Sequence, residues 1–191
     1  WPEARHPGNG RRLRLVYGVI VAGLALVMVA GNALVFLAGW EVMAVAAFLA
    51  VGTEDHLPEV RAASTLYLVV THVSTLCLFA LFTLLHRATG TFELEPVASL
   101  EPGLGTAVFL LGLAGFGLKA GLMPLHVWLP GAHAAAPSHV SALMSGVMTK
   151  VAIYGFVRIT FDLNADPAWW WAVPLLLLGG ISAAMGVLHA L

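Results

Sequence analysis

The sequence is 191 residues long, and its composition points to a protein surrounded by lipid rather than by water. Hydrophobic residues make up 60% of the chain and charged residues 10%, and the mean hydropathy of +0.90 lies far above the range of soluble domains. A formal net charge of -1 leaves no basic surface that could neutralise a phosphate backbone, so nucleic acid is not an expected partner.

The residue types give little support to cofactor chemistry. The one cysteine, Cys77, lies in an apolar run, which excludes an internal disulfide and any cysteine-ligated iron–sulfur cluster or zinc site within the chain. No HExxH, paired-carboxylate, Gly-rich phosphate loop or nucleophile-elbow pattern occurs, so hydrolase chemistry is not expected. We therefore expect no cofactor, no metal and no catalytic residue in this chain.

Six apolar tracts are each long enough to span a bilayer, which takes about 20 residues of helix. Gly31-Asn32 supplies the turn chemistry that divides the first long tract in two, and polar stretches at 53–63, 89–103 and 162–167 separate later tracts. We therefore predict an all-α membrane protein, with a basic polar segment at 1–14 and a membrane domain at 15–191. Its helices are expected at about residues 15–30, 33–52, 64–86, 104–123, 138–159 and 171–191.

Prolines mark a break within the fourth helix. We predict that Pro124 breaks it, because proline removes a backbone donor and clashes with the preceding turn. The short apolar segment that follows is interrupted by Pro130 and Gly131, which indicates a half-helix at 125–130 and a loop packed inside protein rather than against lipid. Pro137 suits the first turn of the fifth helix, where its missing amide would be unpaired anyway.

Both ends of the sequence suggest a piece of a longer protein. No start methionine is present, and Leu191 closes the sequence inside an apolar segment without flanking polar residues. Arginines around the start of the first helix predict that the N-terminal side faces the cytoplasm, since positive residues are retained there. These residues are Arg5, Arg11, Arg12 and Arg14.

Three ionisable residues fall inside the predicted membrane helices. Glu41 is the one acid of ten in the middle of an apolar tract, and Lys119 and Lys150 are the only lysines. A charge at mid-membrane costs about 2.5 to 3.5 kcal/mol on insertion scales, so partners or internal water must offset it. A desolvated lysine gives up its proton readily and an arginine does not. We interpret the three charges as parts of a proton-translocation path; the alternative is that they are structural pairs that fix helix packing in an inert scaffold.

Small residues lie one helical turn before each lysine. A lysine stem leans over the residue four positions earlier, which is Gly115 for Lys119 and Gly146 for Lys150. Glycine at both places predicts room for a long amine or for water. Hydroxyl residues also recur at four-residue spacing before Lys150, where they either hold water or merely satisfy helix contacts. The auxiliary residues of this kind are Ser145 and Thr149, in register with Ser141.

Histidines extend the pattern, since imidazole titrates near neutral pH and can pass protons. His126 and His133 follow Lys119 by seven and fourteen residues, and His139 precedes the second lysine by eleven. These spacings place the side chains near one face if the helices are continuous. We predict a relay role for His126. Auxiliary roles are predicted for His133, His139 and, in the third helix, His72; a structural histidine is the alternative for each.

Three motifs resemble one known family. Residues 33–51, ALVFLAGWEVMAVAAFLAV, look like its fifth helix with a Trp-Glu pair, and residues 119–130, KAGLMPLHVWLP, look like its broken seventh helix. The match covers nearly the whole chain and makes it similar to the antiporter-like membrane subunits shared by respiratory complex I, Mrp-type cation/proton antiporters and group 4 membrane-bound nickel–iron hydrogenases. Residues 133–158, HAAAPSHVSALMSGVMTKVAIYGFVR, most resemble the branch of hydrogenase 4 component B and formate hydrogenlyase subunit 3.

The resemblance implies roles for the charged residues. Glu41 would be the glutamate that pairs with the lysine of the broken helix, Lys119. Lys150 would be the next lysine of a central hydrophilic axis, and His126 a histidine of the same axis. In this family, energy from a separate redox arm is thought to change the distance between the glutamate and the lysine and so to push a proton onward. The implied fold is a larger antiporter-like bundle, of which this chain holds a part.

The resemblance also implies the function and the partners. We expect a proton-translocating membrane subunit of an oxidoreductase complex of the hydrogenase 4, formate hydrogenlyase or NADH:quinone oxidoreductase type, with no redox centre in this chain. Expected partners are other membrane subunits and a peripheral redox arm with iron–sulfur and nickel–iron hydrogenase or NADH dehydrogenase subunits, in the inner membrane of a prokaryote. The alternative is a Mrp-type sodium/proton antiporter subunit that has no redox partner.

Overall fold

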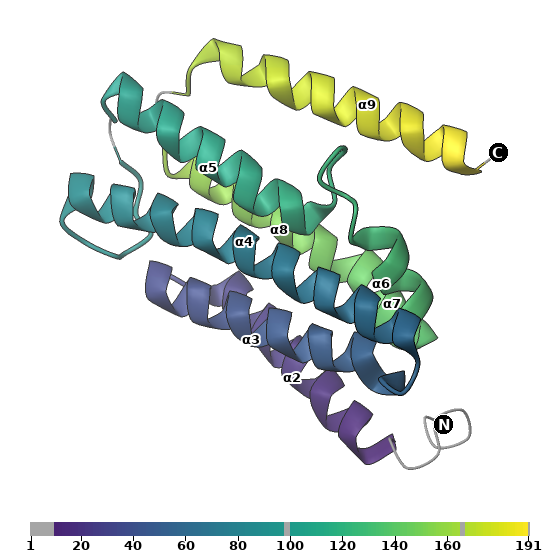
Figure 1. Ribbon diagram of the computed structural model, residues 1–191. Helices are drawn as coiled ribbons and strands as arrows, with labels where there is room; N and C mark the ends of the chain where they lie inside the picture. The colour runs from purple at the N-terminus through teal and green to yellow at the C-terminus, as the bar shows by residue number, and fades with distance from the viewer. Residues whose placement is uncertain (1–9, 98–99, 165–166, 191) are drawn as a thin grey trace.

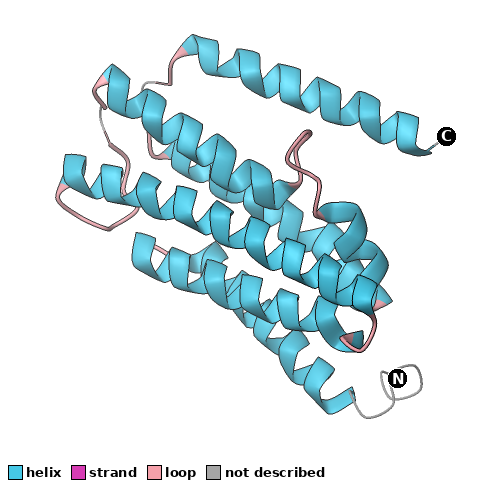
Figure 2. Ribbon diagram, in the orientation of Figure 1, coloured by secondary structure: helices cyan, strands magenta, loops and turns pink. Residues whose placement is uncertain are grey.

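The computed structural model describes residues 10–97, 100–164 and 167–190, and helices joined by short loops make up this part of the chain (Figure 2). In these residues the only β-type pairing is two isolated bridges, Asn32 with Glu93 and Val97 with Asn164. The α-helices are α2 (Gly10–Val29), α3 (Ala33–Val51), α4 (Pro58–Thr89), α5 (Pro102–Ala120), α6 (Leu129–Ala135), α7 (Ser138–Leu143), α8 (Thr149–Val157) and α9 (Ala172–Ala190).

Six stretches of helix in the described residues are long and apolar enough to cross a membrane. Four of them are α2, α4, α5 and α3 with its 3₁₀ turn at Gly52–Glu54. The fifth, Ser138–Asp162, joins α7 to α8 through a π-helical turn at Met144–Met148 and ends in a second one at Arg158–Asp162; the sixth is α9 with the preceding 3₁₀ turn. The prediction of an all-α membrane protein with about six spanning helices is confirmed.

The long helices lie side by side as a bundle, with α4 between α3 and α5 (Figure 1). α2 packs most extensively against α3, and α8 packs against α5. Glycines allow the closest approach of α2 and α3, since a Cβ at Gly23 would come within 2.8 Å of the Met43 amide nitrogen. α9 runs along the outside of the bundle, and most of its length is exposed. This order places α4 in contact with both α3, which carries Glu41, and α5, which carries Lys119.

Two helices are longer than the sequence predicted. α2 begins at Gly10 rather than at residue 15, so part of the basic segment expected at 1–14 is helical; its first nine residues lie outside the described part. α4 runs from Pro58 to Thr89 rather than over 64–86. Pro58 sits in its first turn, where proline is tolerated, and Gly90, with φ of 76°, ends it. Polar residues near water therefore extend these helices instead of ending them.

The position of the helix break differs from the prediction. α5 ends at Ala120, and Gly121 caps it in the left-handed conformation with φ of 74°, which glycine adopts at no steric cost. The break therefore starts before Pro124, which follows a cis peptide bond. The half-helix expected at 125–130 was also misplaced. Helix resumes as α6 at Leu129, because Pro130 suits a first helical turn, not the end of one.

Candidate functional site

Lys119 is buried at the end of α5, with 1% of its surface exposed. Lys119 is the last residue but one of α5, which ends at Ala120. Its Nζ donates a hydrogen bond of 2.9 Å to the Tyr67 hydroxyl of α4. The same nitrogen lies 4.9 Å from the centroid of the Tyr67 ring and 5.8 Å from that of Trp40. Aromatic faces attract a cation electrostatically, which offsets part of the cost of burial.

An aromatic shell holds this arrangement in place. Tyr67 meets the Trp128 ring edge to face at 5.2 Å, and the Trp128 indole donates a 2.7 Å hydrogen bond to the carbonyl of Leu118. On the other side, Trp40 meets the Phe116 ring edge to face at 5.5 Å. The rings next to Lys119, Trp40 of α3 and Tyr67 of α4, are therefore each held by a second ring.

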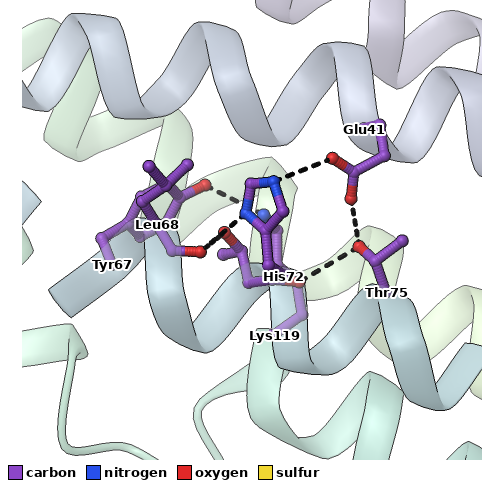
Figure 3. A network of polar contacts seen from close by, with 7 residues as sticks. Glu41, Tyr67, Leu68, His72, Thr75 and Lys119 are labelled. Carbon is purple, nitrogen blue, oxygen red and sulfur yellow. Dashed lines mark hydrogen bonds and ion pairs between the residues drawn. The ribbon is translucent and has the colours of Figure 1, made fainter. Parts of the chain in front are cut away.

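Glu41 lies near the middle of α3 and faces α4 (Figure 3). Its carboxylate accepts a short hydrogen bond from the Thr75 hydroxyl, and its second oxygen lies 3.6 Å from His72 Nε2. His72 Nδ1 is 2.9 Å from the carbonyl of Leu68, so that nitrogen carries a proton, because a carbonyl only accepts. Nε2 can therefore donate to Glu41 only when the imidazole is positively charged.

Glu41 and Lys119 do not form an ion pair within the described residues, since no contact of 4.0 Å or less joins them. α4 bridges them instead, because Thr75 binds Glu41 and Tyr67 binds Lys119 (Figure 3). These two anchor points are eight residues apart, which is about 12 Å of helix rise. The direct pairing that the resemblance implied is thus replaced in this structure by separate contacts to one intervening helix.

Lys150 has different surroundings. Its side chain is exposed on the surface of this chain, and its Nζ donates to the backbone carbonyl of Ser145 at 2.7 Å and to the Thr149 hydroxyl at 3.3 Å. The Ser145 carbonyl lies in the π-helical turn, where the Thr149 amide donates to Met144 five residues back. The Ser145 carbonyl also accepts from the Thr149 hydroxyl at 3.1 Å, and π-helical turns of this kind are frequent at functional sites.

A second polar cluster connects to Lys150 through α7. His133 of α6 lies with Nδ1 2.7 Å from the Ser141 hydroxyl and Nε2 3.5 Å from the Ser145 hydroxyl. Ser145 therefore contacts both side chains, since its hydroxyl lies near the His133 imidazole and its carbonyl accepts from the Lys150 ammonium. The structure thus brings a histidine of α6 to the three residues that the sequence had already placed together on one helix. These four residues are His133, Ser145, Thr149 and Lys150.

The other two histidines predicted near the axis make different contacts. His126, in the loop after the break, has a buried Nδ1 without a hydrogen-bond partner among the described residues. It lines a cavity of about 200 Å³ together with Met123, Ser182 of α9 and other residues. His139 instead packs its ring against Tyr17 of α2, with centroids 5.7 Å apart. His126 therefore faces open space, whereas His139 contacts the first helix.

The sequence reasoning missed Tyr67 and Thr75, which contact the two charged side chains directly. A signal was present, because Tyr67, Thr71 and Thr75 recur at four-residue spacing within an apolar tract and therefore share one helix face. The sequence reasoning also missed a close contact at Gly115. A Cβ there would meet the Leu78 side chain at 2.8 Å, so this glycine makes room for α4. At Gly146 a Cβ would meet nothing within 4 Å, which agrees with the space predicted beside Lys150.

In the part of the chain that the structure describes, no set of side chains is arranged to bind a metal ion. No group of three or more histidine, cysteine, aspartate or glutamate side chains gathers there in a way that could hold an ion.

Comparisons with known proteins give a consistent result. The family model described as "NADH:quinone oxidoreductase/Mrp antiporter, TM" matches residues 30–191. Hydrogenase-4 component B of Escherichia coli (strain K12) is 40% identical over 177 residues, which cover 91% of this chain and 26% of that protein. Formate hydrogenlyase subunit 3 of the same organism is 35% identical over 154 residues, covering 79% of this chain and 24% of the relative. The chain thus spans about a quarter of the length of the curated relatives that it matches.

A solved structure shares the fold. The Mrp complex from Dietzia sp. DQ12-45-1b superposes with a TM-score of 0.80 at 24% identity, over 92% of this chain and 20% of the matching one. The matched family is transmembrane, the two sequence relatives are bacterial, and six helices are suited to span a membrane. The prediction of a multi-pass membrane protein of a prokaryote is therefore confirmed, as is the resemblance drawn from the motifs.

Proposed function

The chain belongs to the NADH:quinone oxidoreductase/Mrp antiporter transmembrane family, and we propose that it is part of a proton-translocating membrane subunit of a respiratory-type oxidoreductase complex. The similarity to hydrogenase-4 component B and formate hydrogenlyase subunit 3 supports a hydrogenase-type complex; an NADH:quinone oxidoreductase-type complex is the other member of this class.

The observation that carries the proposal is the burial of Lys119. Its side chain is 1% exposed, and within the described residues no carboxylate approaches it closely enough for an ion pair. Its partners are the Tyr67 hydroxyl and, 5.8 Å from Nζ, the ring of Trp40, which stabilise an ammonium less than a carboxylate does. A buried cation with such partners is costly, and lysine can reduce the cost by releasing its proton.

We assign Lys119 as the central proton carrier of the path in this chain. Glu41 controls how strongly the ammonium is favoured, because a negative charge stabilises it less as the separation grows. His126 lines a cavity of about 200 Å³, which has room for several waters at about 30 Å³ each. Lys150 is the next lysine, with His133, Ser145 and Thr149 as its polar neighbours.

The electron chemistry belongs to other subunits in this proposal. We propose that no cofactor binds this chain, and that a peripheral redox arm with iron–sulfur and nickel–iron hydrogenase or NADH dehydrogenase subunits supplies the energy. The partners in the bilayer are further membrane subunits, as expected for a chain whose exposed helix faces include charged groups such as Lys150.

The test replaces Lys119 in the full-length protein within its native complex and measures proton uptake into membrane vesicles per assembled complex. Lys119→Ala should lower the rate about 100-fold, the usual contribution of a positioned acid–base group. Lys119→Arg should not restore it, because arginine keeps its proton. Arg87→Ala, which removes an exposed charge at the end of α4, should leave transport unchanged. Wild-type transport in either Lys119 variant would remove the proposal.

A sodium/proton antiporter subunit without a redox partner is the second candidate. The matched family includes Mrp antiporters, and the fold superposes on an Mrp complex. Proton movement that requires a sodium gradient and proceeds without an electron donor would favour this function. Neighbouring genes for nickel–iron and iron–sulfur subunits would favour the first.

A further inference from the structure

The Tyr67 hydroxyl is the hydrogen-bond partner that the described structure gives to Lys119. The bond measures 2.9 Å, and both side chains are buried, with 0% and 1% of their surfaces exposed. Nζ also lies 4.9 Å from the centroid of the same ring. One tyrosine on a neighbouring helix thus contacts the ammonium through its hydroxyl oxygen, with the centre of its ring farther away.

A hydroxyl can serve both charge states of an amine. It accepts a hydrogen bond when lysine is an ammonium, which has only donors, and it donates one when lysine is a neutral amine with a free lone pair. A carboxylate in the same place would only accept, and it would hold the ammonium in its charged form. Tyr67 therefore suits a lysine that must both bind and release a proton.

The position of the Tyr67 ring is fixed by its neighbours. Its ring packs edge to face on Trp128 at 5.2 Å, and the Trp128 indole donates to the carbonyl of Leu118 at 2.7 Å. Leu118 directly precedes Lys119 in α5. The contacts therefore form a closed circuit from the lysine through two aromatic residues back to the backbone beside it, and this circuit holds the hydroxyl near Nζ.

On these grounds we propose that Tyr67 is a positioning residue of the proton path, which holds the Lys119 side chain in place in both protonation states by exchanging the roles of acceptor and donor. The proposal rests on the proposed function of Lys119. It adds Tyr67 to the path. This residue of α4 binds the lysine of α5, and Thr75 of the same helix binds Glu41 (Figure 3).

The experiment is Tyr67→Phe in the full-length protein within its native complex, with proton uptake into vesicles measured per assembled complex over a range of pH. The change removes one oxygen and keeps the ring contacts. Loss of a hydrogen bond to a charged group should lower the rate about tenfold, and the pH at half-maximal transport should move. The matched control is Tyr154→Phe, which removes a hydroxyl that donates to the Met28 carbonyl and accepts from Arg158; its rate and pH profile should match the wild type.

A wild-type rate and pH profile for Tyr67→Phe would overturn the proposal. A lower rate with an unmoved pH profile would also overturn it, because a merely structural role reduces activity without changing the titration. If that variant yields no assembled complex, 3-fluorotyrosine at position 67 keeps the ring and makes the hydroxyl more acidic; an unmoved profile again counts against the proposal and a moved one supports it. Lys119→Ala separates the two claims, since an inactive Lys119→Ala beside a wild-type Tyr67→Phe leaves the proposed function intact.

Discussion

Lys119 and Lys150 lie in opposite surroundings, although both belong to apolar helices. Lys119 is buried beside rings from α3 and α4, whereas Lys150 is exposed and bonds to the carbonyl of Ser145 on its own helix. Tertiary packing thus stabilises the first ammonium, and local helix geometry stabilises the second. Substitutions should therefore disturb the first site through its neighbours on other helices, and the second one mainly through its own backbone.

The largest expected difference concerns the two lysines themselves. Lys119→Met should lower proton transport about 100-fold while leaving the melting temperature of the complex unchanged or higher, because replacing a buried charge by an apolar side chain of similar size removes a desolvation cost. Lys150→Met should give no such increase in melting temperature, because the Lys150 ammonium is exposed and its removal relieves little desolvation cost. Thermal unfolding of the purified complexes, together with vesicle transport, measures both. A clear fall in melting temperature for Lys119→Met would show that its charge is structural.

The two glycines that precede the lysines give the second contrast. Gly115→Ala places a Cβ 2.8 Å from the Leu78 side chain and 3.1 Å from the Ser74 carbonyl, so it should destabilise the α4–α5 contact by about 1 to 3 kcal/mol. Gly146→Ala meets nothing within 4 Å and should be neutral or stabilising by up to about 1 kcal/mol. Thermal unfolding of the two variants compares them directly. Equal effects would mean that α4 and α5 do not pack as closely as described.

A smaller effect is expected from the carboxylate. Glu41→Gln keeps an acceptor for the Thr75 hydroxyl but removes the charge that favours the ammonium of Lys119. Transport should fall about tenfold, since a charge interaction across the protein interior is worth about 1 to 2 kcal/mol. Glu59→Gln, at the exposed start of α4, is the control and should transport at the wild-type rate. If the two variants transport equally well, Glu41 does not act on Lys119.

The smallest effect is expected at Ser145. Its backbone carbonyl, not its hydroxyl, holds Lys150, and the hydroxyl makes only a long 3.5 Å contact with His133. Ser145→Ala should therefore change stability by less than about 0.5 kcal/mol and leave transport near the wild-type rate. A large loss of transport would indicate that the hydroxyl itself carries protons beside Lys150.

Much of the fold followed from the sequence, because helix formation in a bilayer depends on local composition. Apolar tracts of spanning length predicted six membrane helices, and the turn at Gly31-Asn32 was placed correctly, since Asn32 caps α3 with its side chain. Helix ends were less accurate. The sequence predicts the break at Pro124, but Gly121 ends α5 in the left-handed conformation, and no local pattern ranks one residue above the other.

The candidate site was predictable only in part. The sequence alone singles out the three ionisable residues of the apolar helices, because charges in such tracts are rare and costly. These residues are Glu41, Lys119 and Lys150. The partners of the first two did not stand out, because Thr75 and Tyr67 are ordinary residues in a membrane helix. The close contact of Gly115 with Leu78 and Ser74 of α4 was not predicted, since a sequence shows the residue one turn away on the same helix and not the helix that packs against it.

By itself, the sequence determined that this chain lies in a membrane, that it crosses it about six times and that three ionisable side chains are retained within its helices. Only the tertiary structure decided that Lys119 is enclosed and Lys150 open, and that α4 binds Glu41 and Lys119 separately. The physical reason is that transfer to lipid depends on composition along the chain, whereas burial and hydrogen bonding depend on which helices meet.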